Sequence, residues 1–149
     1  MNSDFCVAVH ALVYLNHKAS VLSSEELAEN ICTNPARVRK VTAKLKKAGL
    51  LHTKEGSEGG CRFDLDPASV SLAQVAYALS VRFVETAWHS GDRDMACLVA
   101  SGMANLMDGI FEDLNARCLA RLAELSLADL DRNLFCPVDA GPTRKGEAT

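Results

Sequence analysis

Basic side chains gather in one short stretch of the sequence. Seven lysines and arginines lie between residues 37 and 54, and no aspartate or glutamate stands among them. The whole chain carries a net charge of -3, so this stretch is an exception to the general composition. Clustered cations of this kind bind polyanions, and the phosphate backbone of nucleic acid is the usual one. We therefore expect this stretch to bind double-stranded DNA.

Thiols are the second kind of reactive group, and they stand at residues 6, 32, 61, 97, 118 and 136. The sequence shows no secretory leader and no apolar run that could span a membrane, so we expect a cytoplasmic protein with reduced cysteines. No CxxC or similar close spacing is present, and we predict no metal site and no bound cofactor. Cys6 and Cys118 fall on apolar helix faces and are expected in the core, whereas Cys61 is expected to be exposed.

The basic stretch falls on the second helix of a predicted helix-turn-helix. A capping box before residue 24 starts a short helix over residues 24–30. After a short turn, Asn34 followed by Pro35 starts the basic helix, because asparagine accepts from first-turn amides and proline leaves no donor unsatisfied. Gly49 ends this helix. An earlier helix over residues 4–17 carries an apolar face that predicts a core position.

A β-hairpin is predicted directly after the basic helix. Strand-length runs over residues 50–54 and 61–66 flank the tip EGSEGG at residues 55–60, whose glycines supply the positive backbone angles of a tight turn. A hairpin in this position is the wing of a winged helix-turn-helix. We therefore predict a mainly α fold, with a winged helix-turn-helix DNA-binding domain over residues 1–80.

A long helix is predicted over residues 96–125, which would extend for about 45 Å. That length exceeds the rest of so small a domain, so part of the helix needs a partner from outside. Its apolar stripe consists of Val99, Met103, Leu106, Ile110, Leu114 and Cys118. We predict a homodimer held by this helix, a dimerisation region over residues 81–135 and a mobile tail over residues 136–149.

The residues expected to contact DNA lie on the basic helix and on the wing. A recognition helix enters the major groove by its N-terminal part. The predicted helix contacts are Asn34, Pro35, Ala36, Arg37, Lys40 and Lys44, and the predicted wing contacts are Thr53, Lys54, Ser57 and Gly59. Arg37 is the best candidate to read a guanine edge through its paired donors. Two plainer readings stay open: a basic helix that is merely solvated, and glycines at residues 59 and 60 that serve only the turn.

Three segments together resemble the Rrf2 family of bacterial transcription regulators. They are KKAGLL at residues 46–51, the EGSEGG tip, and PASVSLAQVAYAL at residues 67–79, and the resemblance covers about residues 5–130. It implies a homodimer that binds a palindromic operator. Family wings usually begin with Arg-Gly and end with Gly-Gly-Tyr. Here Glu55 and Cys61 replace the arginine and the tyrosine, so an arginine that could enter the minor groove is missing.

Iron-sulfur members of the family carry three cysteines before and at the start of the long helix. Only Cys97 stands in that segment here, so we do not expect a cluster held in the usual way. Related regulators without cluster ligands are similar in using thiol oxidation, and Cys32 and Cys97 are the redox candidates. In the family arrangement the long helix of one subunit lies beside the DNA-binding domain of the other. A disulfide between Cys32 and Cys97 of two subunits would therefore change the separation of the recognition helices and release DNA.

The sequence is thus interpreted as a dimeric transcription regulator, a repressor, that responds to oxidants through thiols or to a small-molecule inducer. The alternatives are a winged-helix module that binds an acidic protein, and a ligand-responsive or iron-sulfur regulator with atypical ligands. Trp88 and His89 are expected on a loop that packs on the long helix, with a small-molecule pocket as the other reading. No cysteine has a recognisable histidine and asparagine signature, so an enzyme is not expected.

Overall fold

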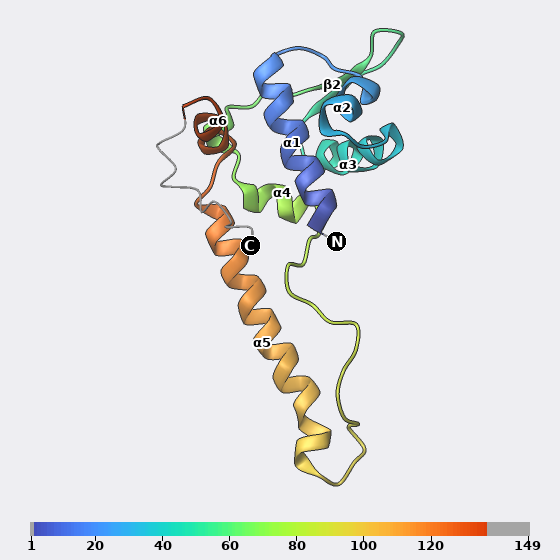
Figure 1. Cartoon of the computed structure of the whole chain (residues 1–149), viewed down its shortest axis with the longest axis vertical. Coiled ribbons are helices and arrows are strands. Elements are labelled where there is room, and N and C mark those ends of the chain that lie inside the picture. Colours follow the sequence, from blue (N-terminus) through green and yellow to red (C-terminus); the bar gives the residue numbers. More distant parts are fainter. Residues whose placement is uncertain (1, 137–149) are drawn as a thin grey trace, which may run out of the picture.

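The computed structural model of the chain describes residues 2–136, and Figure 1 shows how its elements are arranged. In chain order they are α1 (Asn2–Lys18), α2 (Ser24–Ile31), α3 (Pro35–Lys47), β1 (His52–Lys54), β2 (Gly60–Arg62), the 3-10 turn η1 (Pro67–Ser69), α4 (Leu72–Leu79), α5 (Leu98–Ala123) and α6 (Leu127–Phe135). All but α5 gather in one head, from which α5 projects. The predicted mainly helical, winged helix-turn-helix fold is confirmed.

The predicted tail over residues 136–149 lies outside the described residues, except for Cys136. None of the helices described is apolar enough over a sufficient length to cross a membrane.

The helix starts follow the capping signals of the sequence. Ser23 Oγ accepts from the Glu26 amide at 3.1 Å, and the Glu26 carboxylate accepts in return from the Ser23 amide at 2.7 Å, which starts α2. Asn34 Oδ1 accepts from the Arg37 amide at 2.8 Å and starts α3. Gly49 follows α3 at φ +76°, where a side chain would be strained. These local signals place the basic helix where it was predicted.

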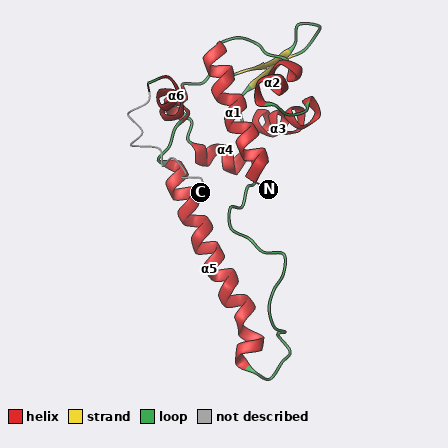
Figure 2. Ribbon diagram, in the orientation of Figure 1, coloured by secondary structure: helices red, strands yellow, loops and turns green. Residues whose placement is uncertain are grey.

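The wing is a short antiparallel hairpin in which β1 pairs with β2, with Thr53 opposite Cys61. Leu22 adds a third short segment, because its N–H and its carbonyl both bond to the Cys61 backbone, at 3.0 and 2.8 Å. The two strands span residues 52–54 and 60–62, so they are shorter than predicted, and the chain leaves the pairing after Arg62. The hairpin lies directly after α3, as the sequence predicts (Figure 2).

The glycines of the wing have two different roles. Gly56 takes a positive φ of +110°, as expected of a hairpin tip, but Gly59 and Gly60 do not. A Cβ on Gly59 would lie 2.4 Å from the Lys54 carbonyl oxygen. One on Gly60 would lie 2.2 Å from the carbonyl oxygen of Leu22. These two glycines are needed for close backbone packing, which favours the reading in which they serve the turn.

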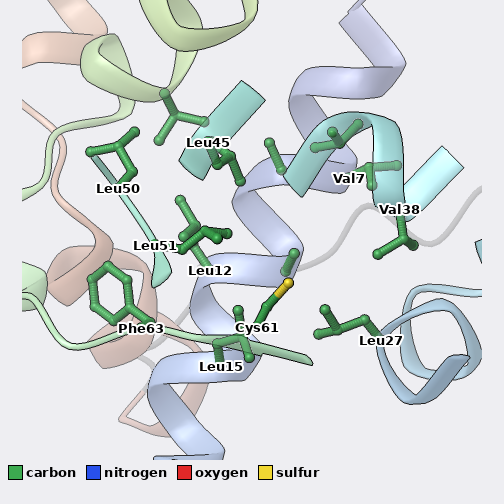
Figure 3. Packing of buried hydrophobic residues seen from close by; sticks show 14 of the residues in the cluster. Val7, Leu12, Leu15, Leu27, Val38, Leu45, Leu50, Leu51, Cys61 and Phe63 are labelled. Carbon is green, nitrogen blue, oxygen red and sulfur yellow. The ribbon is translucent and has the colours of Figure 1, made fainter. Parts of the chain in front are cut away.

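The core lies between α1, α3 and the wing (Figure 3). Leu12 and Leu15 of α1 and Leu45 of α3 are fully buried in it. Cys61 points into the same core and is only 4% exposed, so the prediction that this thiol is exposed is wrong. The reason is the two-residue period of a strand, in which Cys61 faces inward and Arg62 outward. Burial raises the pKa of the Cys61 thiol, which keeps it protonated.

Two other cysteines also lie differently from their predicted positions. Cys6 is exposed, because Val7 and Ala8 make the buried side of this turn of α1. Cys118 is only half-buried on α5. Among residues 2–136, α5 packs on the head near its C-terminal end alone, so most of its apolar side meets no core within this range (Figure 1).

α5 is the predicted long helix, with 26 residues that extend for about 39 Å. Among the side chains of this helix only Asn115 is buried. Large apolar side chains lie exposed along one side of it: Leu98, Val99, Met103, Leu106, Ile110 and Leu114. We call these six residues the α5 stripe. The apolar pattern of the sequence is therefore present as an open surface.

The loop between α4 and α5 is held to α5 by Asn115. Its Oδ1 accepts from the backbone N–H groups of Phe83 and Val84, at 2.8 and 2.9 Å. Its Nδ2 donates to the carbonyls of Val84 and Phe111, at 2.5 and 3.0 Å. Phe83 also packs edge to face on Phe5 of α1, with ring centroids 5.4 Å apart. One side chain, which sequence reasoning missed, thus joins the head to the long helix.

Candidate nucleic-acid interface

α3 presents one side to the core and the opposite side to solvent. The buried side consists of Val38, Val41, Thr42 and Leu45. The opposite side consists of Ala36, Lys40, Ala43 and Lys47, and all four are exposed. We call these four residues the α3 outer face. Its alanines leave the helix backbone accessible and its lysines make it positive, so this face can enter a groove lined with phosphates.

The first turn of α3 holds three of the predicted contacts. Asn34 is exposed, but its Oδ1 is engaged in the helix cap, which leaves the Nδ2 group as its donor. Pro35 is half-buried and sets the start of the helix. Ala36 is exposed beside them. The first-turn amides of a helix attract anions, so this end of α3 suits a phosphate group.

Arg37 lies at the edge of the α3 outer face, next to α1. Its Nε donates to Asp4 Oδ1 at 2.9 Å, and Lys40 Nζ lies 3.5 Å from the other carboxylate oxygen. The hydrogen bond from Arg37 lowers the pKa of Asp4 below its usual value, with help from Lys40 and against the effect of burial. The Arg37 side chain is still 33% exposed. The predicted base-reading residue is therefore at the surface, but α1 holds it on one side.

Lys44 extends the basic surface toward the chain that follows α4. It is exposed, and it lines a polar pocket of about 260 Å³. The other charged and polar side chains around this pocket are Asp4, Lys40, Ser80, Arg82 and Glu85.

Arg39 is a candidate contact that sequence reasoning missed. It lies at the other edge of the α3 outer face, is 59% exposed, and pairs with Glu25 of α2. The sequence does carry the signal, because the spacing of the buried residues on α3 places position 39 beside the outward side. That signal lies in the periodicity of the whole helix and not in its first turn.

The wing presents cations on its strands and carboxylates at its tip. Three of its predicted contacts are exposed, namely Thr53, Lys54 and Ser57. Gly59 is half-buried, with no room for a side chain. Glu55 and Glu58 are exposed at the tip, where they repel phosphate. The strands therefore fit a DNA backbone better than the tip does.

Cys32 and Cys97, the redox candidates, both lie exposed at helix ends. Cys32 ends α2 at φ +59°, and its thiol donates to the Glu29 carbonyl at 3.7 Å. Cys97 precedes α5, and the amides of Ala100 and Val99 lower the pKa of its thiol. α2, which ends at Cys32, belongs to the head, whereas the N-terminal end of α5, which follows Cys97, lies far from the head (Figure 1). The two thiols of one chain are therefore far apart. A disulfide between them would need a second copy of the chain.

The loop beside α5 forms a second pocket, also of about 260 Å³. His89 Nε2 lies 3.1 Å from Asp108 Oδ1, and Arg93 donates to Asn105 Oδ1 at 3.0 Å. Trp88 is 74% exposed, so its ring does not pack on α5 in this chain. The loop thus lies against α5, as predicted, but through polar contacts.

The described part of the chain, residues 2–136, holds no evident metal site. No group of three or more histidine, cysteine, aspartate or glutamate side chains in this range is placed to hold a metal ion. Cys97 is also the only cysteine between residues 81 and 105. The described residues of one chain therefore do not fit an iron cluster held by three cysteines.

A helix-turn-helix with an exposed basic face, followed at once by a hairpin, defines a winged helix-turn-helix protein of the DNA-binding class. A family model described as an iron-dependent transcriptional regulator matches residues 1–133. The chain belongs to this family, the Rrf2 regulators, and the resemblance seen in its sequence is confirmed.

Individual relatives agree with this assignment. The candidate HTH-type transcriptional regulator YwnA of Bacillus subtilis (strain 168) is 33% identical over 137 residues, which cover 91% of this chain and 99% of that protein. A candidate transcriptional regulator from Lactobacillus plantarum, known from a crystal structure, is 26% identical, with a TM-score of 0.81 over 91% of this chain and 92% of that one. IscR of T. potens, 17% identical with a TM-score of 0.66 over 95% and 93% of the two chains, shares the fold. The chain is therefore a transcriptional regulator and not an enzyme.

Proposed function

We propose that this Rrf2 regulator is a homodimeric repressor that binds a palindromic operator in double-stranded DNA. The observation that carries the proposal is the α3 outer face, a positively charged and exposed side of the helix that precedes the wing in the chain. The net charge of the chain is -3, so general attraction to DNA does not explain such a surface. A basic face on a helix that follows a capped turn is suited to the major groove.

The contacts on DNA divide into those that position the protein and those that read sequence. Lys40 and Lys44 neutralise phosphates, while Ala36 lets the helix approach the base edges. Arg37 reads sequence, because its Nε is engaged by Asp4 but its two terminal nitrogens remain to donate to guanine. On the wing, the contacts to phosphate or the minor groove are Thr53, Lys54 and Ser57.

The α5 stripe supports the homodimer. Leu98 is 86% exposed and Leu106 is 63% exposed, although burying a large apolar side chain is worth about 1.5 to 3 kcal/mol. The spacing of the stripe, in steps of mostly three and four residues, is that of a helix seam. We assign it to the same stripe of a second copy, which would hold two copies of α3 at a fixed separation. A symmetric dimer reads a palindromic site.

Repression is the simplest output of such a dimer. A protein that occupies an operator overlapping a promoter excludes the polymerase by its bulk alone. A reporter gene placed behind the operator is expected to be more active in cells that lack the protein.

Oxidation of Cys32 and Cys97 is the proposed signal. Hydrogen peroxide would take two electrons and two protons from the two thiols, which leaves one disulfide and two molecules of water. The reactive form of a thiol is the thiolate, and the amides at the start of α5 lower the pKa of Cys97. A disulfide from Cys32 of one protomer to Cys97 of its partner would move the two copies of α3 and release DNA. A small-molecule inducer in the pocket between the loop and α5 is the alternative signal.

Selection of duplexes from a random-sequence pool tests DNA binding. We expect the reduced protein to enrich a palindromic sequence, with an affinity that falls steeply with salt. Alanine at Arg37 is expected to cost about 1 to 3 kcal/mol on that sequence and much less on random DNA. Alanine at Arg132 of α6, which is exposed and pairs with Asp129, removes the same charge away from α3 and is the control. Equal losses on both DNAs would make Arg37 a phosphate contact, and failure to enrich any sequence would contradict operator binding.

Sedimentation tests the dimer. Leu106→Glu places a charge in the α5 stripe and is expected to give a monomer, whereas Ala116→Glu, at an exposed position of the same helix that is not one of the six stripe residues, is expected to leave a dimer. A wild-type protein that sediments as a monomer at micromolar concentration would contradict the assignment of the stripe.

Non-reducing electrophoresis after mild peroxide tests the thiol signal. We expect a covalent dimer that disappears in Cys32→Ser and in Cys97→Ser but persists in Cys136→Ser. Unchanged DNA binding after peroxide would exclude thiol sensing. Colour in protein purified without oxygen would instead support an iron-sulfur regulator with atypical ligands.

A further inference from the structure

Asp4, in the first turn of α1, reaches across to the recognition helix. One carboxylate oxygen accepts from Arg37 Nε at 2.9 Å, and the other lies 3.5 Å from Lys40 Nζ. We propose that Asp4 is a positioning residue for sequence recognition: it fixes the Arg37 guanidinium so that the two terminal nitrogens face the DNA. The inference rests on the proposed reading of DNA by Arg37.

The chemistry of the guanidinium makes this arrangement useful. The group is planar, and a carboxylate that holds Nε leaves the two terminal nitrogens as a paired donor. Guanine offers a matching pair of acceptors, O6 and N7, in the major groove. A free arginine would lose side-chain freedom on binding, and a guanidinium already fixed in one plane loses less of it. Asp4 therefore favours binding to a sequence that matches Arg37.

The helix turn that carries Asp4 is held in place by its neighbours. Phe5, the next residue, packs edge to face on Phe83 at 5.4 Å. The Phe83 backbone N–H is in turn held by Asn115 of α5 at 2.8 Å. The first turn of α1 is thus attached to the loop and to the long helix, so Asp4 is presented by a rigid part of the head.

The other edge of α3 provides a comparison within the same molecule. Glu25 pairs with Arg39 there, and both side chains are more exposed, at 63% and 59%, than Asp4 and Arg37, at 26% and 33%. Both acids lie in the first turn of their helices, so they resemble each other in charge and in helix position. Only the Asp4 carboxylate has two cations of α3 within reach.

A different role for Asp4 predicts a different result. A carboxylate beside the DNA could simply repel phosphate, in which case its removal would strengthen binding to every sequence alike. The ratio of affinities for selected and scrambled duplexes separates the two roles, because a uniform electrostatic change cancels in that ratio.

The experiment uses the full-length chain and the duplex that it enriches from a random pool, with a scrambled duplex of equal length as reference. Asp4→Asn is expected to lower the affinity ratio about threefold to fivefold, the size expected when one partner of a partly exposed ion pair is lost. Glu25→Gln removes the same charge at the other edge and is expected to leave the ratio unchanged. Adding Asp4→Asn to Arg37→Ala is expected to lower the ratio no further, because Asp4 acts through Arg37.

Each outcome either supports or overturns the positioning role of Asp4. An unchanged ratio in Asp4→Asn, or equal losses in Asp4→Asn and Glu25→Gln, overturns the positioning role, and so does a further loss in the double variant. Melting temperatures of all variants show whether a loss of affinity comes from unfolding. If a lower melting temperature explains the loss in Asp4→Asn, the positioning role of Asp4 is also overturned. If no duplex is enriched, the proposed function fails and takes this inference with it. If a duplex is enriched but Asp4→Asn leaves the affinity ratio unchanged, the positioning role of Asp4 fails while the proposed function stands.

Discussion

Removing the side chain of Asn115 is expected to loosen the connection between the head and the long helix. Asn115→Ala deletes four hydrogen bonds and leaves two N–H groups and one carbonyl of the loop, at Phe83 and Val84, without their partner. A buried polar group without a partner costs about 1 to 3 kcal/mol, but the loop is only half-buried and water can replace part of the loss. We therefore expect Asn115→Ala to lower the free energy of unfolding by about 2 to 4 kcal/mol.

Urea unfolding followed by circular dichroism measures this loss, with all proteins at one concentration because the stability of the proposed dimer would depend on concentration. Asn105→Ala is the matched control on the same helix, since Asn105 accepts a single exposed hydrogen bond, from Arg93. That variant is expected to unfold within about 0.5 kcal/mol of the wild type. If Asn115→Ala costs no more than Asn105→Ala, the loop is not attached in the way we infer.

Three further results are expected. Gly60→Ala should lower the free energy of unfolding by about 1 to 3 kcal/mol in urea, because its Cβ would lie 2.2 Å from a backbone oxygen, whereas Gly109→Ala on open helix surface should be neutral or stabilising. Cys97 should react with iodoacetamide well before Cys61 in a mass-spectrometric time course, since the first thiol is exposed with a lowered pKa and the second is buried with a raised one; equal rates would contradict this. The pKa of Asp4 is lowered from the ordinary 3.8, so its pairing stabilises the fold fully above that pH and is lost as the pH falls through the lowered value. Asp4→Asn should therefore lose less stability between pH 4 and pH 2 than the wild type, and parallel acid curves would refute the assignment.

The elements that the sequence predicts correctly are those whose signals are local. The capping box before α2, the cap and the proline of α3, and the glycine after α3 each act within a few residues, so their geometry can be read without the rest of the fold. The apolar stripe of α5 is likewise a periodic signal on one helix. Together with the hairpin, these signals are sufficient for the fold class and for the family.

The features that sequence reasoning missed depend on contacts between distant residues. Asp4 and Arg37 are 33 residues apart in the sequence, and Asn115 and Val84 are 31 residues apart. No local sequence pattern therefore predicts either contact. The position of Cys61 is a different case. Its inward direction follows from the two-residue period of the strand, but its replacement of a family aromatic suggested an exposed site, and the core accepted a smaller side chain instead.

The N-terminal half of α5 has no buried side chain, because Asn115 is the only buried residue of the helix. Its side-chain hydrogen bonds to the loop are exposed, and helical segments of this length are marginal in water on their own, so a second copy packed on the α5 stripe would help to keep this half ordered. Hydrogen exchange in this half should then slow as the protein is concentrated, while exchange in the head stays constant. In a cell, the number of proposed dimers able to bind an operator would rise with the square of the number of copies made, as long as most copies are single chains. The level of synthesis would thereby become an input to the regulator, beside any chemical signal that it senses.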